Sequence, residues 1–244
     1  MAELRKIVWL ALIAGVVAGI AVTAAQWFTT IPLILEAERY EHPAQEAEAT
    51  ASTSKEPAAT HAGNHEHEHD GVLARTGNTL LFNVLAGIGF GLLLSALFST
   101  LGAHGVGTGL AVGLGGFLAV GLAPALGLPP ELPGIVAAEL FARQMWWVGT
   151  AVASTVGLAL VVFGRHNALR LVGIALLFVP HLIGAPHPHS IPSGGPPAEL
   201  QRLFIVASLG STALFWLVLG GTLGWLHARG KQSSSTTTVV PGPA

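Results

Sequence analysis

The sequence contains no cysteine among its 244 residues. Disulfide frameworks, thiolate metal sites, iron–sulfur clusters and thiol catalysis are therefore excluded, and any metal ligand must be a nitrogen or oxygen atom. Charged residues are also scarce, at 10%, compared with roughly 25% in a soluble domain. Because 51% of the residues are hydrophobic, the composition indicates a membrane protein whose first partner is lipid.

Recognised catalytic motifs are also lacking. The formal net charge of −2 gives no basic surface that would indicate nucleic-acid binding. The sequence has no nucleotide-binding glycine loop, no His-Glu-x-x-His zinc pair and no nucleophile elbow. We therefore predict that the chain is not an enzyme, that it holds no permanently bound cofactor, and that ATP does not drive it directly.

Six apolar stretches are each near the ~20 residues that cross a bilayer. The first is longer than the apolar core of a signal peptide, which has about 7–15 residues, so we interpret it as a span. The sequence thus predicts an all-α fold, a polytopic transmembrane helix bundle of about six spans. The predicted spans are Ile7–Phe28, Thr79–Leu101, Thr108–Leu126, Met145–Phe163, Ala168–Ala185 and Leu203–Leu226.

These spans divide the chain into four predicted parts. Residues 1–40 hold the first span and its outer end, and residues 41–78 form an acidic, His-rich outer loop. Residues 79–229 form a bundle of five spans, and residues 230–244 form a cytoplasmic tail. The loop and the Ser/Thr-rich tail have the polar composition of disordered segments.

The basic residues predict the orientation of the bundle. With six spans both termini share one side, which should be the cytoplasm because basic residues collect there. All thirteen carboxylates except Glu3 fall on the opposite side, where they would attract cations. His104, His166 and His227 fall at the inner surface, where we interpret them as interfacial polar residues. The basic residues on this inner side are Arg5, Lys6, Arg165, Arg170, Arg229 and Lys231.

The outer loop contains a dense group of histidines interleaved with carboxylates. Neutral imidazole with carboxylate suits Zn, Cu, Fe, Ni or Co, and either an extended or a helical segment would let neighbouring imidazoles chelate a cation. The alternative is a solvated polar linker. The candidate metal ligands in this loop are His61, His65, His67 and His69.

The fifth span carries an ionisable residue at membrane depth. His181 would lie roughly 20 Å into the hydrocarbon core, and such residues usually mark a functional pathway. Pro180 precedes it, so we predict that the helix breaks there and stops near Val179, as in the broken helices of transporters. His187 and His189 would continue a ligand path outward. The alternative is a structural hydrogen bond from His181 to a neighbouring helix.

Two further segments carry polar groups near the outer boundary. Gln26, Glu36 and Glu38 are candidate pathway residues that could supply oxygen ligands, although an interfacial amphipathic turn explains them equally well. Residues 128–147 predict a proline-fixed turn and a short helix in which Glu139 pairs with Arg143. We expect this segment to be a structural cap rather than a gate or a docking surface.

Three segments together resemble the CbtA family of proposed bacterial cobalt transporter subunits. The resemblance implies an integral protein of the bacterial inner membrane, with a small single-span, histidine-bearing partner of the CbtB type and a link to cobalamin-related cobalt uptake. It also implies five spans, one fewer than the residue pattern predicts. The matching segments are Pro32–Glu41, Leu128–Gly134 with Ala142–Trp147, and Pro180–Pro186.

The leading hypothesis is therefore a membrane transporter subunit that takes up a divalent transition metal, cobalt on resemblance and nickel or zinc on ligand chemistry. The metal would be substrate rather than cofactor. A metal-binding sensor or buffer without transport activity is the alternative, and a haem-binding membrane protein is a third class. Self-association into a homo-oligomer is compatible with any of them.

Overall fold

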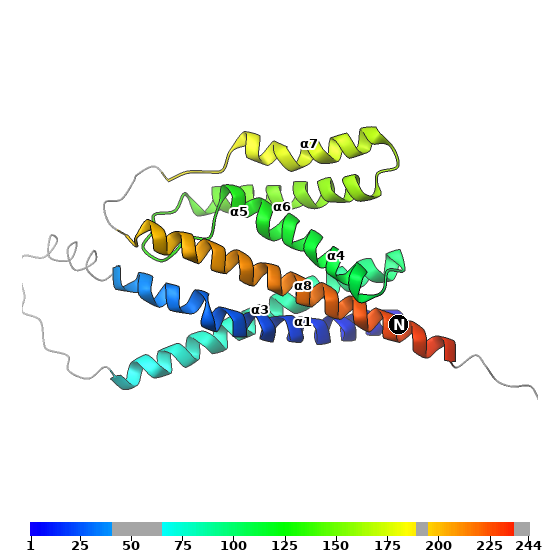
Figure 1. Cartoon of the computed structure of the whole chain (residues 1–244), viewed down its shortest axis with the longest axis horizontal. Coiled ribbons are helices and arrows are strands. Elements are labelled where there is room, and N and C mark those ends of the chain that lie inside the picture. The colour runs from blue at the N-terminus through cyan, green and yellow to red at the C-terminus, as the bar shows by residue number, and fades with distance from the viewer. Residues whose placement is uncertain (41–64, 189–194, 237–244) are drawn as a thin grey trace, which may run out of the picture. The chain divides into compact units, whose positions relative to one another are not determined.

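The computed structural model describes residues 1–40, 65–188 and 195–236, and within these residues the secondary structure is helical, with no strand. Residues 30–40 form a further helical segment after a turn at Thr29. The other helices, shown in Figure 1, are α1 (Ala2–Phe28), α3 (His65–Leu101), α4 (Val106–Gly116), η1 (Phe117–Leu122), α5 (Ala123–Gly127), α6 (Leu140–Phe163), α7 (Asn167–Ile183) and α8 (Ala198–Thr236).

Among the described residues, five stretches are long and apolar enough to cross a membrane, and α7 is a shorter apolar helix of 17 residues. At ~1.5 Å per residue, α7 is about 26 Å long, close to the lower limit for a span. The prediction of an all-α bundle with about six spans is confirmed. The five long stretches are Glu3–Phe28, Arg75–Leu101, Val106–Gly127, Leu140–Phe163 and Ala198–Gly230.

Two helices extend beyond the spans that hydropathy predicts. The backbone of α3 is helical from His65, inside the segment assigned to the outer loop, and α8 continues to Thr236, inside the predicted tail. Polar residues at the end of an apolar helix prolong its hydrogen-bond ladder without adding hydropathy, so a hydropathy window does not detect them. Residues 41–64 and 237–244 lie outside the described part of the chain.

The predicted break at Pro180 is wrong by one turn. The helix α7 passes through Pro180 and ends at Ile183, so His181 belongs to its last helical turn. Pro180 removes only one backbone donor, and the amide of Gly184 closes the turn by donating to the Pro180 carbonyl at 3.1 Å. Gly184 then leaves the helix with φ of +86°, a conformation that favours glycine.

Two local features differ from the sequence predictions. Residues 129–139 are not helical, so no short helix precedes α6, and Gly134 turns the chain with φ of +81°. The third span, in contrast, contains a six-residue π-helix, η1, between α4 and α5. Pro124 follows η1 and cannot donate a backbone hydrogen bond, which favours a locally altered ladder.

The chain divides into two compact units. Unit 1 comprises Met1–Thr23, Thr79–Leu118 and Thr212–Ala244, and unit 2 comprises Ala24–Asn78 and Ala119–Ser211.

Close backbone contact between glycines joins α4 to α8 in unit 1. A Cβ atom at Gly109 would lie 2.2 Å from the Gly220 carbonyl oxygen, and one at Gly224 would lie 2.3 Å from that of Gly105. The Gly105 amide donates to the Gly224 carbonyl at 2.9 Å. Since lipid tails are as apolar as leucine, such close packing rather than apolar burial must hold the helices together.

The contact between α1 and α3 in unit 1 follows the same rule. Gly15 faces Gly87 and Ile88, where an added Cβ would lie 2.4 Å from the Ile88 amide nitrogen. An interhelical hydrogen bond supports this contact, because Asn83 donates to the Thr23 hydroxyl at 2.9 Å. The small residues of the sequence therefore mark the helix contacts.

His227 is buried rather than interfacial, which contradicts the sequence interpretation. Its side chain is 6% exposed, and its Nε2 lies 3.2 Å from the Ser95 hydroxyl. Its ring packs on Phe98 with centroids 5.3 Å apart. His227 on α8 is therefore buried by contacts with α3, which the sequence of α8 alone could not predict.

In unit 2 the helices α6 and α7 lie side by side as an antiparallel pair (Figure 1). Gly157 and Gly173 face each other, and a Cβ on either would lie under 3 Å from the other's carbonyl oxygen. Thr150 and Ser154 are buried on α6. This pair carries His181 at its end.

Substituting Gly109 by alanine should destabilise the chain, while Gly107→Ala should be neutral or slightly stabilising. Both glycines lie on α4, but a Cβ at Gly107 would meet nothing within 4 Å. Overpacking costs about 1–3 kcal/mol, whereas Gly→Ala in a helix gains up to about 1 kcal/mol. Thermal unfolding in detergent measures both variants, and equal melting temperatures would contradict the close contact.

Candidate metal pathway

His181 lies at the end of α7 against an aromatic side chain of α6. Its ring meets the edge of Trp146 with centroids 5.9 Å apart and planes at 69°, and the side chain is partly buried. This edge-to-face arrangement is one of the preferred geometries of aromatic pairs, which favours the observed position of the imidazole. His181 is therefore a candidate nitrogen ligand that packs on α6 at the end of the apolar helix α7.

Trp146 is itself held tightly. Gly127 at the end of α5 leaves room for its ring, since a Cβ there would lie 2.2 Å from the indole and 3.1 Å from Ala185. The Thr150 hydroxyl donates to the Trp146 carbonyl at 2.8 Å. The indole Nε1 and the Ser154 hydroxyl are both buried without a hydrogen-bond partner in the described residues. The side of α6 that carries Trp146 thus contains polar atoms that the described part of unit 2 does not satisfy.

Within unit 2, residues 128–139 form a non-helical segment, here called the strap, that packs on neighbouring helices. Leu132 is 2% exposed and forms a buried cluster with Ala37 and Phe204. The Gln201 side chain fixes the strap twice, because its Oε1 accepts from the Leu132 amide at 3.1 Å and its Nε2 donates to the Pro130 carbonyl at 2.8 Å. One apolar anchor and one amide therefore set the course of the strap.

The charged residues of the strap pair differently from the sequence prediction, in which Glu139 and Arg143 were partners. Arg143 instead binds Glu131 at 2.9 Å, with both side chains largely buried. Glu139 caps α6, and its two carboxylate oxygens accept from the amides of Phe141 and Ala142 at 2.9 and 2.7 Å. These backbone hydrogen bonds lower the pKa of Glu139 below its ordinary value of 4.5.

The candidate pathway carboxylates are both in ion pairs. Glu36 pairs with Arg39 at 3.1 Å within its own helical segment. Glu38 accepts from Arg75 Nη1 at 2.7 and 3.0 Å, which ties residues 30–40 to α3 across the outer loop. Gln26 lies partly buried near the end of α1. Glu36 and Glu38 are therefore bound to arginine side chains, and Gln26 is far from His181 in the sequence.

The other candidate histidines are only partly described. His187 follows α7 in a non-helical segment and is exposed, whereas His61 and His189 lie outside the described residues. His65, His67 and His69 belong to the first turns of α3, but their side chains also lie outside the described part. Within the described residues, no group of three or more His, Asp or Glu side chains could hold a metal ion.

Three distant segments of the sequence meet in unit 2. The strap joins residues 30–40 through Leu132 and Ala37. It joins the start of α6 through Glu131 and Arg143. The start of α6 joins the end of α7 through Trp146, against His181 and Ala185. These are the segments on which the family resemblance rests.

Comparison with protein families decides the assignment. A family model described as the probable cobalt transporter subunit (CbtA) matches residues 4–228. The chain belongs to the CbtA family. No curated protein and no solved structure matches the chain.

Membership of the CbtA family supports a role in cobalt transport. The description as a subunit implies that the chain acts with a partner subunit. Together with five helices long enough to cross a bilayer, it identifies a multi-pass membrane protein of a transporter.

Sequence reasoning missed several residues that make the contacts of unit 2 described above. From the sequence, Trp146 was expected to be a headgroup anchor. The only indication of a further role was its position in the segment Ala142–Trp147, which resembles the family. Gln201 carries no signal, because one glutamine near the start of a helix is ordinary. Arg75 is likewise unremarkable until its contact with Glu38 is known.

Replacing Glu139 by alanine should lower the melting temperature at neutral pH by about 2–4 °C, because the cap of α6 is lost. The lowered pKa means that the capping stabilisation is present above about pH 4.5 and is lost as the pH falls through the folded-state pKa. The difference between wild type and Glu139→Ala should therefore shrink in acid. Glu199→Ala, at an exposed position in the first turn of α8, is the control.

Proposed function

We propose that the chain is the permease subunit of a divalent transition-metal uptake system, with cobalt as the preferred substrate. The supporting observation is the imidazole of His181, which packs against Trp146 where the three segments of the family resemblance meet. Imidazole nitrogen suits cobalt, nickel and zinc, whereas magnesium and calcium prefer oxygen ligands.

The ion pairs of Glu36 and Glu38 favour this nitrogen chemistry. Arginines already neutralise both carboxylates, so a hard cation such as magnesium would have to displace them. His181 and His187 then become the leading ligands of the described path, and His189 would extend it. Gln26, Glu36 and Glu38 are secondary candidates that could complete the coordination after rearrangement.

The His-rich segment has a different proposed role. His65 and His69 are four residues apart within α3, the spacing that places two positions on one helix face. With His61 and His67 they would raise the local cation concentration beside the bundle. The Glu38–Arg75 ion pair brings together the two residues that flank this loop in the sequence.

We place both termini in the cytoplasm of a bacterium and the bundle in its inner membrane. Six crossings put Arg5, Arg165 and Arg229 on one side, as the preference of basic residues for the cytoplasm requires. The partner would be a small single-span subunit of the CbtB type that bears histidine. A coupling ion or the membrane potential would supply the energy.

The substitution His181→Ala should lower cobalt uptake by about tenfold or more at any cobalt concentration, because the transport step itself would lose a ligand and even outer-shell changes at metal sites typically cost about 10–100-fold in affinity or activity. Uptake of radioactive cobalt in metal-limited cells that express the chain with its partner measures the loss. His166→Ala is a matched control, because His166 is an exposed helix-cap residue whose side chain makes no capping hydrogen bond.

Equal uptake by wild type and His181→Ala would contradict the proposed pathway. Flux into vesicles that contain a metal-sensitive dye separates a transporter from the alternative. Binding without flux, by the chain together with its partner, would indicate a sensor or buffer.

Replacing His61, His65, His67 and His69 together by glutamine should weaken uptake only when cobalt is scarce. Collection of cations raises their local concentration but leaves the transport step unchanged, so the apparent KM should rise while the maximal rate stays constant. The control replaces Ser52, Thr53, Ser54 and Thr60 by glutamine in the same loop. A fall in maximal rate would assign these histidines to the pathway itself.

A further inference from the structure

In unit 1 the start of α1 and the end of α8 lie next to each other, and both carry basic residues. The Lys6 Cε and Nζ atoms lie 3.5 Å from the position that a Cβ at Gly230 would occupy, so the start of α1 contacts the end of α8. Arg5 and Arg229 flank this contact in the sequence. Glu3 is the one carboxylate in the first turn of α1. The contact therefore concentrates positive charge at one edge of unit 1.

Each of these helix ends also carries an arginine four residues from a tryptophan. On α8 the Arg229 guanidinium stacks 3.9 Å from the centre of the Trp225 ring. On α1 the pair is Arg5 and Trp9, both exposed. Tryptophan prefers the headgroup level of a bilayer. A guanidinium can stack on an aromatic ring through its face while the N–H groups in its own plane bind phosphate.

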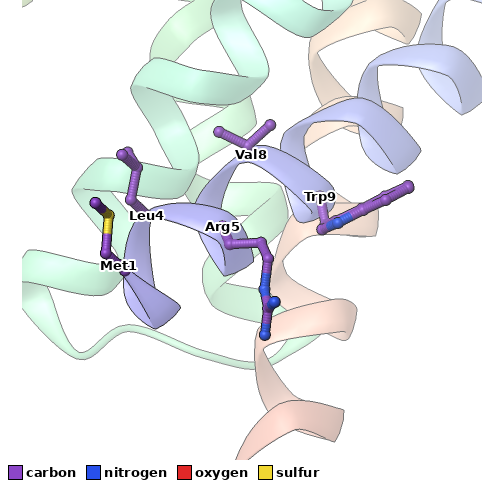
Figure 2. Close-up of a pocket in the computed structure, with 5 residues that line it drawn as sticks. All are labelled: Met1, Leu4, Arg5, Val8 and Trp9. Carbon is purple, nitrogen blue, oxygen red and sulfur yellow. The ribbon is translucent and has the colours of Figure 1, made fainter.

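A hollow of about 620 Å³ lies beside these groups on α1. Figure 2 shows its lining, in which Arg5 is the charged group among Met1, Leu4, Val8 and Trp9. A guanidinium beside exposed apolar side chains matches a ligand that has a phosphate at one end and a hydrocarbon chain at the other. A small soluble anion would use only the arginine.

We infer that this edge of unit 1 is a binding site for an anionic phospholipid. Arg5, Lys6 and Arg229 bind the headgroup phosphate, and Leu4, Val8 and Trp9 contact the upper part of an acyl chain. The two helix ends carry Arg5, Lys6 and Arg229 against the single carboxylate Glu3, and juxtamembrane basic clusters of this kind bind acidic lipid. The site is independent of the metal pathway in unit 2, so either proposal can fail alone.

Native mass spectrometry of the purified chain tests the site with phosphatidylglycerol and with phosphatidylcholine of the same acyl chains. Wild type should bind phosphatidylglycerol more tightly. The double variant Arg5→Gln/Arg229→Gln should lose about 30-fold of this affinity, because each basic group near an acidic membrane surface contributes about one kcal/mol and about 1.4 kcal/mol is tenfold. Trp9→Ala keeps every charge and should weaken both lipids.

The control variant Arg165→Gln/Arg202→Gln removes the same charge from two exposed positions in unit 2 and should bind phosphatidylglycerol like wild type. Equal losses in the two double variants would overturn the site, since charge alone would then explain binding. Displacement of the lipid by inorganic phosphate at comparable concentration would also overturn it, because a soluble anion would then be the ligand. Circular dichroism verifies that each variant retains its helices.

Discussion

Helices in a bilayer gain nothing from covering leucine with leucine, because the surrounding lipid tails are equally apolar. What remains is close approach of the backbones, and this chain achieves it with glycine. At the α4–α8 contact the carbonyl of Gly220 occupies the space that a side chain on Gly109 would need. The same device joins α1 to α3 and α6 to α7. The packing within each unit depends on these contacts.

Polar groups add specificity to this packing. Asn83 with Thr23 and His227 with Ser95 each join two helices of unit 1 through side chains that lipid cannot satisfy. In unit 2 the strap performs a similar task outside the spans, where Gln201 and Arg143 fix it from two different helices. These contacts join the strap to α6, whose first turns carry Trp146, and Trp146 in turn contacts His181.

Much of the fold could be predicted from the sequence. Hydropathy located the spans because an apolar helix of about 20 residues is nearly the only way to cross a bilayer. The end of α7 was harder to predict, since a proline in a last turn costs only one hydrogen bond and the hydrogen bond of Gly184 closes the turn. The partner of Arg143 was equally hard to predict, because Glu139 lies four residues away but uses its carboxylate for the helix cap.

The sequence by itself determined that this is a cysteine-free membrane protein of about six helices, rich in small residues and resembling the CbtA family, because composition and hydropathy constrain a chain in lipid so strongly. It also marked His181 as a buried ionisable group. Only the tertiary structure decided that Trp146 packs against this histidine, that Arg75 binds Glu38, and that His227 is enclosed between two helices. Those facts depend on contacts between residues distant in sequence, and no local pattern encodes which side chains will meet.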